Sequence, residues 1–166
     1  LLGASKGAGM VFYCNPNNPV ATAVGGKATR DYIAAVHKSS PNTAILVDEA
    51  YFEYATMPGY ETMVPLAVTD PKVVVARTFS KAYGMAGLRV GYAVGHKDAI
   101  KKMADWDGTA SVNCLGVAAV RAALSLDPAV LAAESKRNTE ARAFTMKWFS
   151  DRGYKPTDSQ TNFIFV

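Results

Sequence analysis

Short apolar runs alternate with segments of helical spacing along the first half of the chain. Four runs, at 10–15, 43–50, 72–79 and 89–95, are rich in β-branched or aromatic residues and are predicted to be strands. Between the first two runs, Tyr32, Ile33 and Val36 recur at helical spacing and predict a helix over about 26–39. Nearly continuous apolar strands between helices are typical of an α/β fold with helices on both faces of a sheet.

The second half of the chain is predicted to be mainly helical. Helices are expected over 97–106 and 113–126. A longer helix is expected to begin with Asp127 as its N-cap and Pro128 at its first position, and to end at Gly153 as a C-cap glycine. A loop follows, and the apolar residues 162–166 predict the beginning of another strand.

Composition narrows the class of protein. The 166 residues are 49% hydrophobic, and the formal net charge of +4 is spread along the chain with no run of five basic residues, which argues against nucleic-acid binding. No apolar run has the length of a membrane span, so no membrane association is expected. Cys14 and Cys114 lie in unrelated contexts and no CxxC motif occurs, so we expect free thiols, a cytoplasmic protein and no bound metal.

Polar side chains gather where three of the predicted strands end. The first strand is followed by Asn15 to Asn18, the second by Asp48, Glu49 and Tyr51, and the third by Thr78, Ser80 and Lys81. Ligands of open α/β sheets bind at the carboxyl ends of the strands. If the three strands are parallel neighbours, these side chains converge on one crevice.

The chemistry of this set suits one kind of ligand. A carboxylate can keep a heterocyclic nitrogen protonated, and a phenol and an amide can both hydrogen-bond a ring oxygen. Hydroxyl groups and an arginine such as Arg89 can bind a phosphate. A lysine at a strand exit can form a Schiff base with an aldehyde. Ring nitrogen, ring hydroxyl, phosphate and aldehyde together describe pyridoxal phosphate, the electron sink of carbanion chemistry.

Three motifs then resemble a known family in their order and spacing. They are "NPNNP" at 15–19, "DEAYFEY" at 48–54 and "TFSKAYGMAGLRVGY" at 78–92. The chain resembles the class I/II aminotransferases of the aspartate-aminotransferase superfamily (fold type I), nearest to the histidinol-phosphate aminotransferase branch, over almost its whole length. The resemblance implies one half of a three-layer α/β/α large domain with a mostly parallel sheet, plus the start of a small α+β domain.

The resemblance also implies a division of the chain. Residues 1–127 would be the C-terminal half of the domain that binds pyridoxal phosphate. Residues 128–166 would be the linking helix and the first strand of the small domain. The sequence would then be part of a longer chain, and these residues alone are expected to be inactive.

Each motif contributes cofactor residues under this resemblance. Lys81 would form the Schiff base with the cofactor and shuttle a proton between the substrate Cα and the cofactor C4′. The other residues would bind the ring and the phosphate: Asp48 the pyridine nitrogen, Asn18 and Tyr51 the ring oxygen O3′, and Thr78, Ser80 and Arg89 the phosphate. Glu49, beside Asp48, is interpreted as structural. The family usually has Thr-Gly after Asn18 and Pro19, where this chain has Val20 and Ala21, so the turn there is expected to differ.

The implied function is that of a pyridoxal-phosphate-dependent transaminase. It would move an amino group between an L-amino acid, or an amine of the histidinol-phosphate kind, and a 2-oxo acid, and it would act as a homodimer. Two alternatives stay open: a decarboxylase or C–S lyase on the same fold, and a ligand-sensing domain without catalysis. Simpler roles also stay open for single residues, with Asp48 as a helix cap, Tyr51 as a packing residue, Thr78 as a turn cap and Arg89 as the partner of a surface acid.

Overall fold

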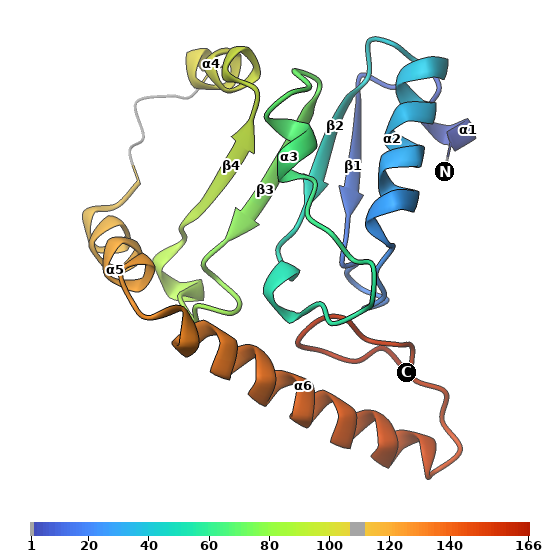
Figure 1. Cartoon of the computed structure of the whole chain (residues 1–166), viewed down its shortest axis with the longest axis vertical. Coiled ribbons are helices and arrows are strands. Elements are labelled where there is room, and N and C mark those ends of the chain that lie inside the picture. Colours follow the sequence, from blue (N-terminus) through green and yellow to red (C-terminus); the bar gives the residue numbers. More distant parts are fainter. Residues whose placement is uncertain (1, 107–111) are drawn as a thin grey trace.

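A four-stranded sheet organises the chain in the computed structural model, which describes residues 2–106 and 112–166 (Figure 1). The strands β1 (Met10–Cys14), β2 (Ala44–Asp48) and β3 (Val73–Thr78) run parallel, and β4 (Gly91–Gly95) runs antiparallel to β3. All four predicted strands are confirmed, each with its bounds shifted by no more than two residues. The α/β class and the mostly parallel sheet are therefore confirmed as well.

The carboxyl ends of the three parallel strands lie at one edge of the sheet. Cys14 is the register partner of Asp48, which in turn pairs with Ala76 in β3. Figure 1 shows these three ends directed toward the long helix α6 (Pro128–Ser150). The strand exits that carry the polar side chains are therefore neighbours in space.

One face of the sheet carries the hydrophobic core. The helices α2 (Gly26–Ser39) and α3 (Val64–Ala67) lie over this face, in front of the sheet in Figure 1. The buried apolar side chains come from both layers. The helical layer contributes Ile33 and Val36 of α2, Ala67 of α3, and Met63, which precedes α3. The central strands contribute Ile45, Val47, Val73 and Val75. The period-2 alternation of side chains along β2 and β3 sends every second residue into this core.

The opposite face of the sheet is open over β1. Met10 and Phe12 are 61% and 62% exposed there. Of the two helical layers that the sequence predicts, the described residues thus supply one. The helix α4 (Lys97–Trp106) follows the edge strand β4. It therefore approaches the open face at that edge, where Ile100 lies beside Gly95.

The second half of the chain is helical, as predicted. The helices are α4, α5 (Cys114–Leu124) and α6, and the Asp127 side chain accepts a hydrogen bond from the Ala129 N–H at 2.8 Å, which confirms the N-cap. The last helical residue is Ser150, and Gly153 follows with φ 83°, a left-handed conformation that suits glycine. Among residues 2–106 and 112–166, no single helix is long and apolar enough to span a membrane; α5 and α6 meet that test only as a pair bent by 93°.

No strand forms at 162–166 within the described residues, so the predicted first strand of the small domain stays a prediction. This segment has no strand neighbour within the described part of the chain, and its backbone folds back so that Thr157 N–H donates to Phe165 O at 2.9 Å. Side chains hold the adjoining residues instead, since Gln160 Oε1 accepts hydrogen bonds from the backbone N–H groups of Thr56 and Met57. A strand requires a partner ladder, and apolar composition alone cannot supply one.

A buried arginine fixes α6 to the sheet half of the molecule. Arg142 is 8% exposed and donates hydrogen bonds to the Tyr54 carbonyl at 3.0 Å and to Thr56 Oγ1 at 2.8 Å. Burial lowers the pKa of this guanidinium from its ordinary value. The helix begins at Pro128, where the domain boundary is predicted, and that division of the chain stays a prediction.

Four short helical elements escape the sequence patterns. They are α1 (Leu2–Ser5), α3, and the 3₁₀ turns η1 (Phe52–Tyr54) and η2 (Ala86–Leu88). Each spans three or four residues, which is too short to show a helical period. Two of them matter for the site, since η1 follows β2 and η2 precedes β4.

Candidate active site

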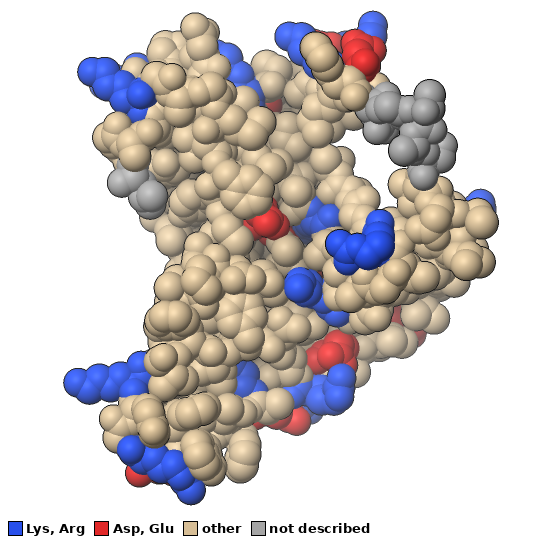
Figure 2. All heavy atoms as spheres, turned by 180° about the vertical axis from the view of Figure 1, so that it is seen from behind, with Lys and Arg blue, Asp and Glu red and all other residues tan. Residues whose placement is uncertain are grey.

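A cleft of about 610 Å³ lies at the carboxyl edge of the sheet. This size is ordinary for a small-molecule site, which typically measures ~300–1,000 Å³. All seven predicted site residues line it: Asn18, Asp48, Tyr51, Thr78, Ser80, Lys81 and Arg89. Figure 2 shows acidic and basic side chains close together in a hollow on this side of the molecule. The structure thus brings the three motifs together, and the role of each residue stays a prediction.

Strand alternation delivers Asp48 to the cleft. Asp48 ends β2 and lies opposite Cys14, on the face away from the buried Val47. Its Oδ1 accepts a hydrogen bond from the Ala50 N–H at 3.0 Å. Within the described residues, no hydrogen bond reaches Oδ2. Asp48 therefore orders a tight turn without capping a helix, and it keeps one carboxylate oxygen for a ligand.

The amide and the phenol of the first two motifs are already joined. Asn18 Nδ2 donates a hydrogen bond to Tyr51 Oη at 3.1 Å. Tyr51 is only 4% exposed, and Phe163 packs edge-on against its ring with centroids 5.4 Å apart. Tyr51 therefore packs and lines the cleft at the same time, so the two roles considered for it are compatible.

Lys81 stands in the cleft without a polar partner among the described residues. Its half-buried side chain places Nζ 5.4 Å from the centroid of the Tyr51 ring. The turn that holds it is ordered on both sides: the Ser80 N–H donates to Thr78 Oγ1 at 3.0 Å, and the Gly84 N–H donates to the Lys81 carbonyl at 2.9 Å. Gly84 has φ 68°, so the turn requires a residue that tolerates the left-handed region.

The predicted phosphate residues differ in how they are engaged. Thr78 Oγ1 accepts the Ser80 N–H and lies 3.5 Å from the Val90 carbonyl, so its hydroxyl does cap the turn. Across the described chain, the Ser80 hydroxyl and the Arg89 guanidinium make no contact with an acidic side chain. Arg89 Nη1 donates to the Ala86 carbonyl at 2.7 Å, and its backbone adopts φ 53° and ψ 48°. Such strained non-glycine conformations cluster at functional sites.

The turn after Asn18 keeps a glycine-like shape without glycine. Ala21 has φ 64° and is fully buried. Its N–H donates to the Asn17 carbonyl at 3.0 Å, and its own carbonyl accepts from the Gln160 N–H at 2.7 Å. The left-handed conformation costs an alanine about 1–2 kcal/mol. The backbone at this position therefore takes the conformation that the family's usual glycine would favour, although the sequence departs there.

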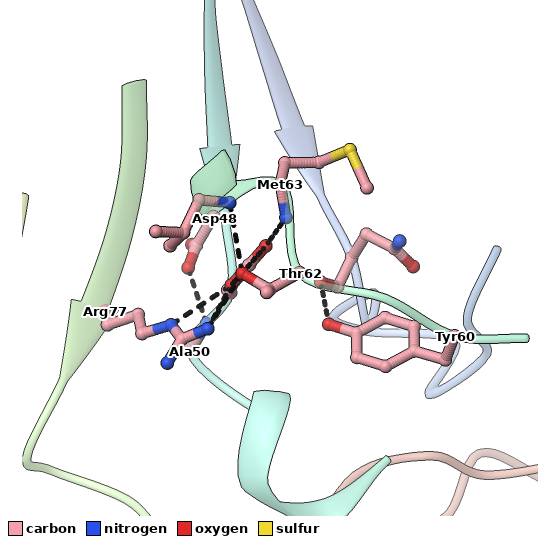
Figure 3. A network of polar contacts seen from close by, with 9 residues as sticks. Asp48, Ala50, Tyr60, Thr62, Met63 and Arg77 are labelled. Carbon is pink, nitrogen blue, oxygen red and sulfur yellow. Dashed lines mark hydrogen bonds and ion pairs between the residues drawn. The ribbon is translucent and has the colours of Figure 1, made fainter. Parts of the chain in front are cut away.

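A buried ion pair joins Glu49, the residue after Asp48, to Arg77, the residue before Thr78, and Figure 3 shows the polar network around Arg77. Glu49 is 1% exposed, and its Oε2 accepts from Arg77 Nε at 3.0 Å and Nη2 at 2.8 Å. Thr62 Oγ1 donates to the same carboxylate at 2.8 Å, and the Met63 N–H donates to Oε1 at 2.7 Å. The interpretation of Glu49 as structural is consistent with this network, whereas Arg77 was not singled out from the sequence.

Sequence reasoning also missed several apolar and small residues of the cleft. Phe12, Cys14 and Gly91 line it, and Phe163 covers the Tyr51 ring from outside the three motifs. Burial raises the pKa of the Cys14 thiol, and the nearby Asp48 adds to that shift. The only sequence signal for Phe12 and Cys14 was their place on the first strand, where Cys14 is the last residue and Phe12 lies two residues before it.

Replacing Gly91 by alanine is expected to destabilise the protein by about 1–3 kcal/mol. A Cβ at this position would lie 2.8 Å from the backbone oxygen of Arg77, which cannot move without disturbing β3. Urea unfolding of the full-length protein measures the effect. Gly87→Ala is the matched control because a Cβ there meets nothing within 4 Å, and equal stability of the two variants would contradict the prediction.

Comparison with known proteins identifies the family of this chain. A sequence model of the family "Aminotransferase class I and II" matches residues 2–166. This chain belongs to that family. Its aminotransferase relatives include a histidinol-phosphate aminotransferase of Shouchella clausii, which is 38% identical over 158 residues, covering 95% of this chain and 42% of the relative. An aromatic amino acid aminotransferase of Mycobacteroides abscessus is 40% identical over 157 residues, covering 95% and 44%.

A solved aminotransferase structure supports the same fold. The histidinol-phosphate aminotransferase of Sinorhizobium meliloti, in complex with pyridoxal-5'-phosphate, superimposes with a TM-score of 0.85 at 30% identity. The match covers 95% of this chain and 41% of that one. The chain therefore spans less than half the length of the relatives that it matches.

Proposed function

We propose that the full-length protein is a pyridoxal-phosphate-dependent aminotransferase. It would move an amino group between an L-amino acid, or an amine of the histidinol-phosphate kind, and a 2-oxo acid. One observation carries the proposal: the cleft brings an unengaged lysine, Lys81, together with the half-engaged carboxylate of Asp48. The names of the relatives, histidinol-phosphate and aromatic amino acid aminotransferases, support this substrate class.

The residues of the cleft fit the cofactor group by group. Asp48 Oδ2 would accept a hydrogen bond from a protonated ring nitrogen. The joined pair of Asn18 and Tyr51 would orient the ring hydroxyl oxygen. The Ser80 hydroxyl and the Arg89 guanidinium would bind the phosphate, and Thr78 would keep their turn in shape. The hydrogen bond from Asn18 Nδ2 to Tyr51 Oη means that both groups already have the separation that a shared acceptor requires.

Lys81 would do the chemistry that moves a proton. Bound pyridoxal phosphate supplies an electron sink that stabilises negative charge at the substrate Cα. The Nζ of Lys81 is the amine that would hold the aldehyde before substrate arrives, and afterwards it would take the proton from Cα as a general base. The Tyr51 ring, with its centroid 5.4 Å from Nζ, lies beside this amine in the cleft.

The assembly and the compartment are part of the same proposal. We infer a homodimer from the family resemblance, and a reducing, cytoplasmic setting from the cysteines. Cys14 and Cys114 are both free thiols. The stretch of 166 residues is not expected to transaminate by itself, since it spans 42% and 44% of the two relatives described above.

Spectroscopy of the full-length protein tests the proposal. Adding pyridoxal phosphate is expected to give a saturable visible absorbance band, and adding amino donor and 2-oxo acid is expected to yield the matching oxo acid and amino acid in equal amounts. Histidinol phosphate and aromatic L-amino acids are the donors to try first. Release of carbon dioxide or a thiol instead would support the lyase or decarboxylase alternative. Absence of any band would contradict cofactor binding altogether.

A further inference from the structure

The buried pair of Glu49 and Arg77 lies on the back of the strands whose front carries the predicted cofactor residues. Side chains alternate between the two faces of a strand. Asp48 and Thr78 therefore lie on the cleft face, while the side chains of their neighbours Glu49 and Arg77 meet on the covered face. Arg77 also lines part of the cleft. The pair joins the exits of β2 and β3 at the level where the regular ladder ends, since the Glu49 N–H donates the last bond to the Ala76 carbonyl at 2.9 Å.

The contacts of the pair leave it little freedom. The Glu49 carboxylate accepts from Arg77, from Thr62 Oγ1 and from the Met63 N–H. Arg77 Nη2 donates in addition to Thr62 Oγ1 at 2.9 Å, and the guanidinium carbon lies 3.8 Å from the centroid of the Phe52 ring. In this two-pronged contact Arg77 Nε and Nη2 both donate to the one oxygen Oε2 of Glu49, which restrains orientation as well as distance. The side chains of Arg77 and Glu49 are 16% and 1% exposed, so water cannot replace these bonds easily.

We propose that the Glu49–Arg77 pair is a positioning device for the cofactor site. It holds the carboxylate of Asp48 and the turn from Thr78 to Lys81 at a fixed separation. The site can then bind the ring-nitrogen end and the aldehyde end of one cofactor molecule at the same time. The inference rests on the proposed function and goes beyond it, because it gives the pair the task of positioning other residues of the site.

The pair also keeps the charge behind the cleft balanced. With both partners present, the two charges cancel, and the cofactor is exposed to the field of Asp48. Removing one partner leaves the other charge uncompensated close behind the site, where screening by solvent is weak. The ionisable groups near the pair include Glu53, Tyr60, Tyr83 and Tyr92. The two single variants are therefore expected to shift the pKa of the lysine-bound cofactor in opposite directions.

Three variants of the full-length protein test this: Glu49→Gln, Arg77→Gln and the double variant. Each is expected to bind pyridoxal phosphate at least tenfold more weakly than wild type in an absorbance titration. The pH midpoint of the visible band of the lysine-bound cofactor is expected to fall in Glu49→Gln, because the unpaired Arg77 cation disfavours the protonated form. The midpoint is expected to rise in Arg77→Gln and to return toward the wild-type value in the double variant.

A second ion pair, whose Glu61 precedes Thr62 in the chain, supplies the control. Arg30 and Glu61 also bond side chain to side chain, at 2.5 Å, but their side chains are 44% and 52% exposed. Glu61→Gln and Arg30→Gln are expected to leave both the affinity and the midpoint unchanged. If Arg77→Gln does not fold, Arg77→Lys replaces it: the charge stays and the two-pronged contact is lost, so affinity should fall tenfold with an unmoved midpoint.

The outcomes separate this inference from the function on which it rests. A wild-type protein without a visible band contradicts the proposed function, and the positioning role with it. A wild-type protein with a band, whose Glu49→Gln variant matches Glu61→Gln in affinity, overturns only the positioning role. Midpoints that move in the same direction in both single variants also overturn it, because a general loosening of the fold would produce that result.

Discussion

Lys81→Ala in the full-length protein is expected to lower transaminase activity by about 10³-fold, within the range of ~10²–10⁴ that a positioned acid–base group contributes. The variant should also lose covalent attachment of pyridoxal phosphate, because no other lysine lines the cleft. Both losses follow from one atom, the Nζ of Lys81, which makes no polar contact within the described residues. Steady-state turnover and mass spectrometry after borohydride reduction measure them.

The stability of Lys81→Ala should change little. The only described interaction of Nζ is its position 5.4 Å from the Tyr51 ring, worth about 0.5–1 kcal/mol. Lys72→Ala is the matched control. Lys72 directly precedes β3, at the end of that strand far from Lys81, and it donates a hydrogen bond to the Pro41 carbonyl. An active Lys81→Ala protein, or equal losses in the two variants, would show that Lys81 is not the catalytic lysine.

The convergence of the site residues could be predicted from the sequence, whereas their roles stay predictions. Asp48 and Lys81 were found because acids and lysines at the ends of buried strands are visible as breaks in apolar runs. Their convergence then needed only parallel neighbours, and the registers of β1, β2 and β3 supply these. Local rules were sufficient because strand alternation and strand exits are themselves local.

Features that depend on distant partners could not be predicted. The antiparallel direction of β4 follows from the tight return from Lys81 to Gly91, whose geometry apolar content does not encode. The expected strand at 162–166 has no partner within the described residues, and strands form only beside other strands, so apolar composition alone could not decide it. Arg77 looked like an ordinary strand residue, and its importance appears only when Glu49, 28 positions earlier, lies against it.

The structure distinguishes two of the predicted phosphate residues by their hydrogen bonds. Thr78 and Ser80 both carry hydroxyls near Lys81, and the sequence left open that Thr78 caps the turn. The structure commits Thr78 Oγ1 to the Ser80 N–H, whereas the Ser80 hydroxyl keeps no described partner. The two residues therefore suit different tasks, one ordering the turn and the other meeting the ligand.

Asp48→Asn is the second replacement with a large expected effect. It is expected to reduce kcat by about 10²–10³-fold, the usual cost of removing one electrostatic group that stabilises charge in the transition state. The amide keeps an oxygen that can accept the Ala50 N–H, at 3.0 Å in the wild type, so the turn should survive. What the variant loses is the negative charge that would keep the ring nitrogen protonated, and hence the capacity of the ring to accept electrons from the substrate Cα.

Kinetics can separate this electrostatic role from binding. An interaction that is stronger in the transition state than in the bound substrate lowers kcat and leaves KM nearly unchanged. Asp31→Asn is the control, because Asp31 carries its charge on the surface, 2.6 Å from Lys27, where an ion pair contributes about 0–1 kcal/mol. If Asp48→Asn raised KM while kcat stayed within threefold, Asp48 would be a binding residue only. The proton on the ring nitrogen would then have to be held by some other group of the full-length protein.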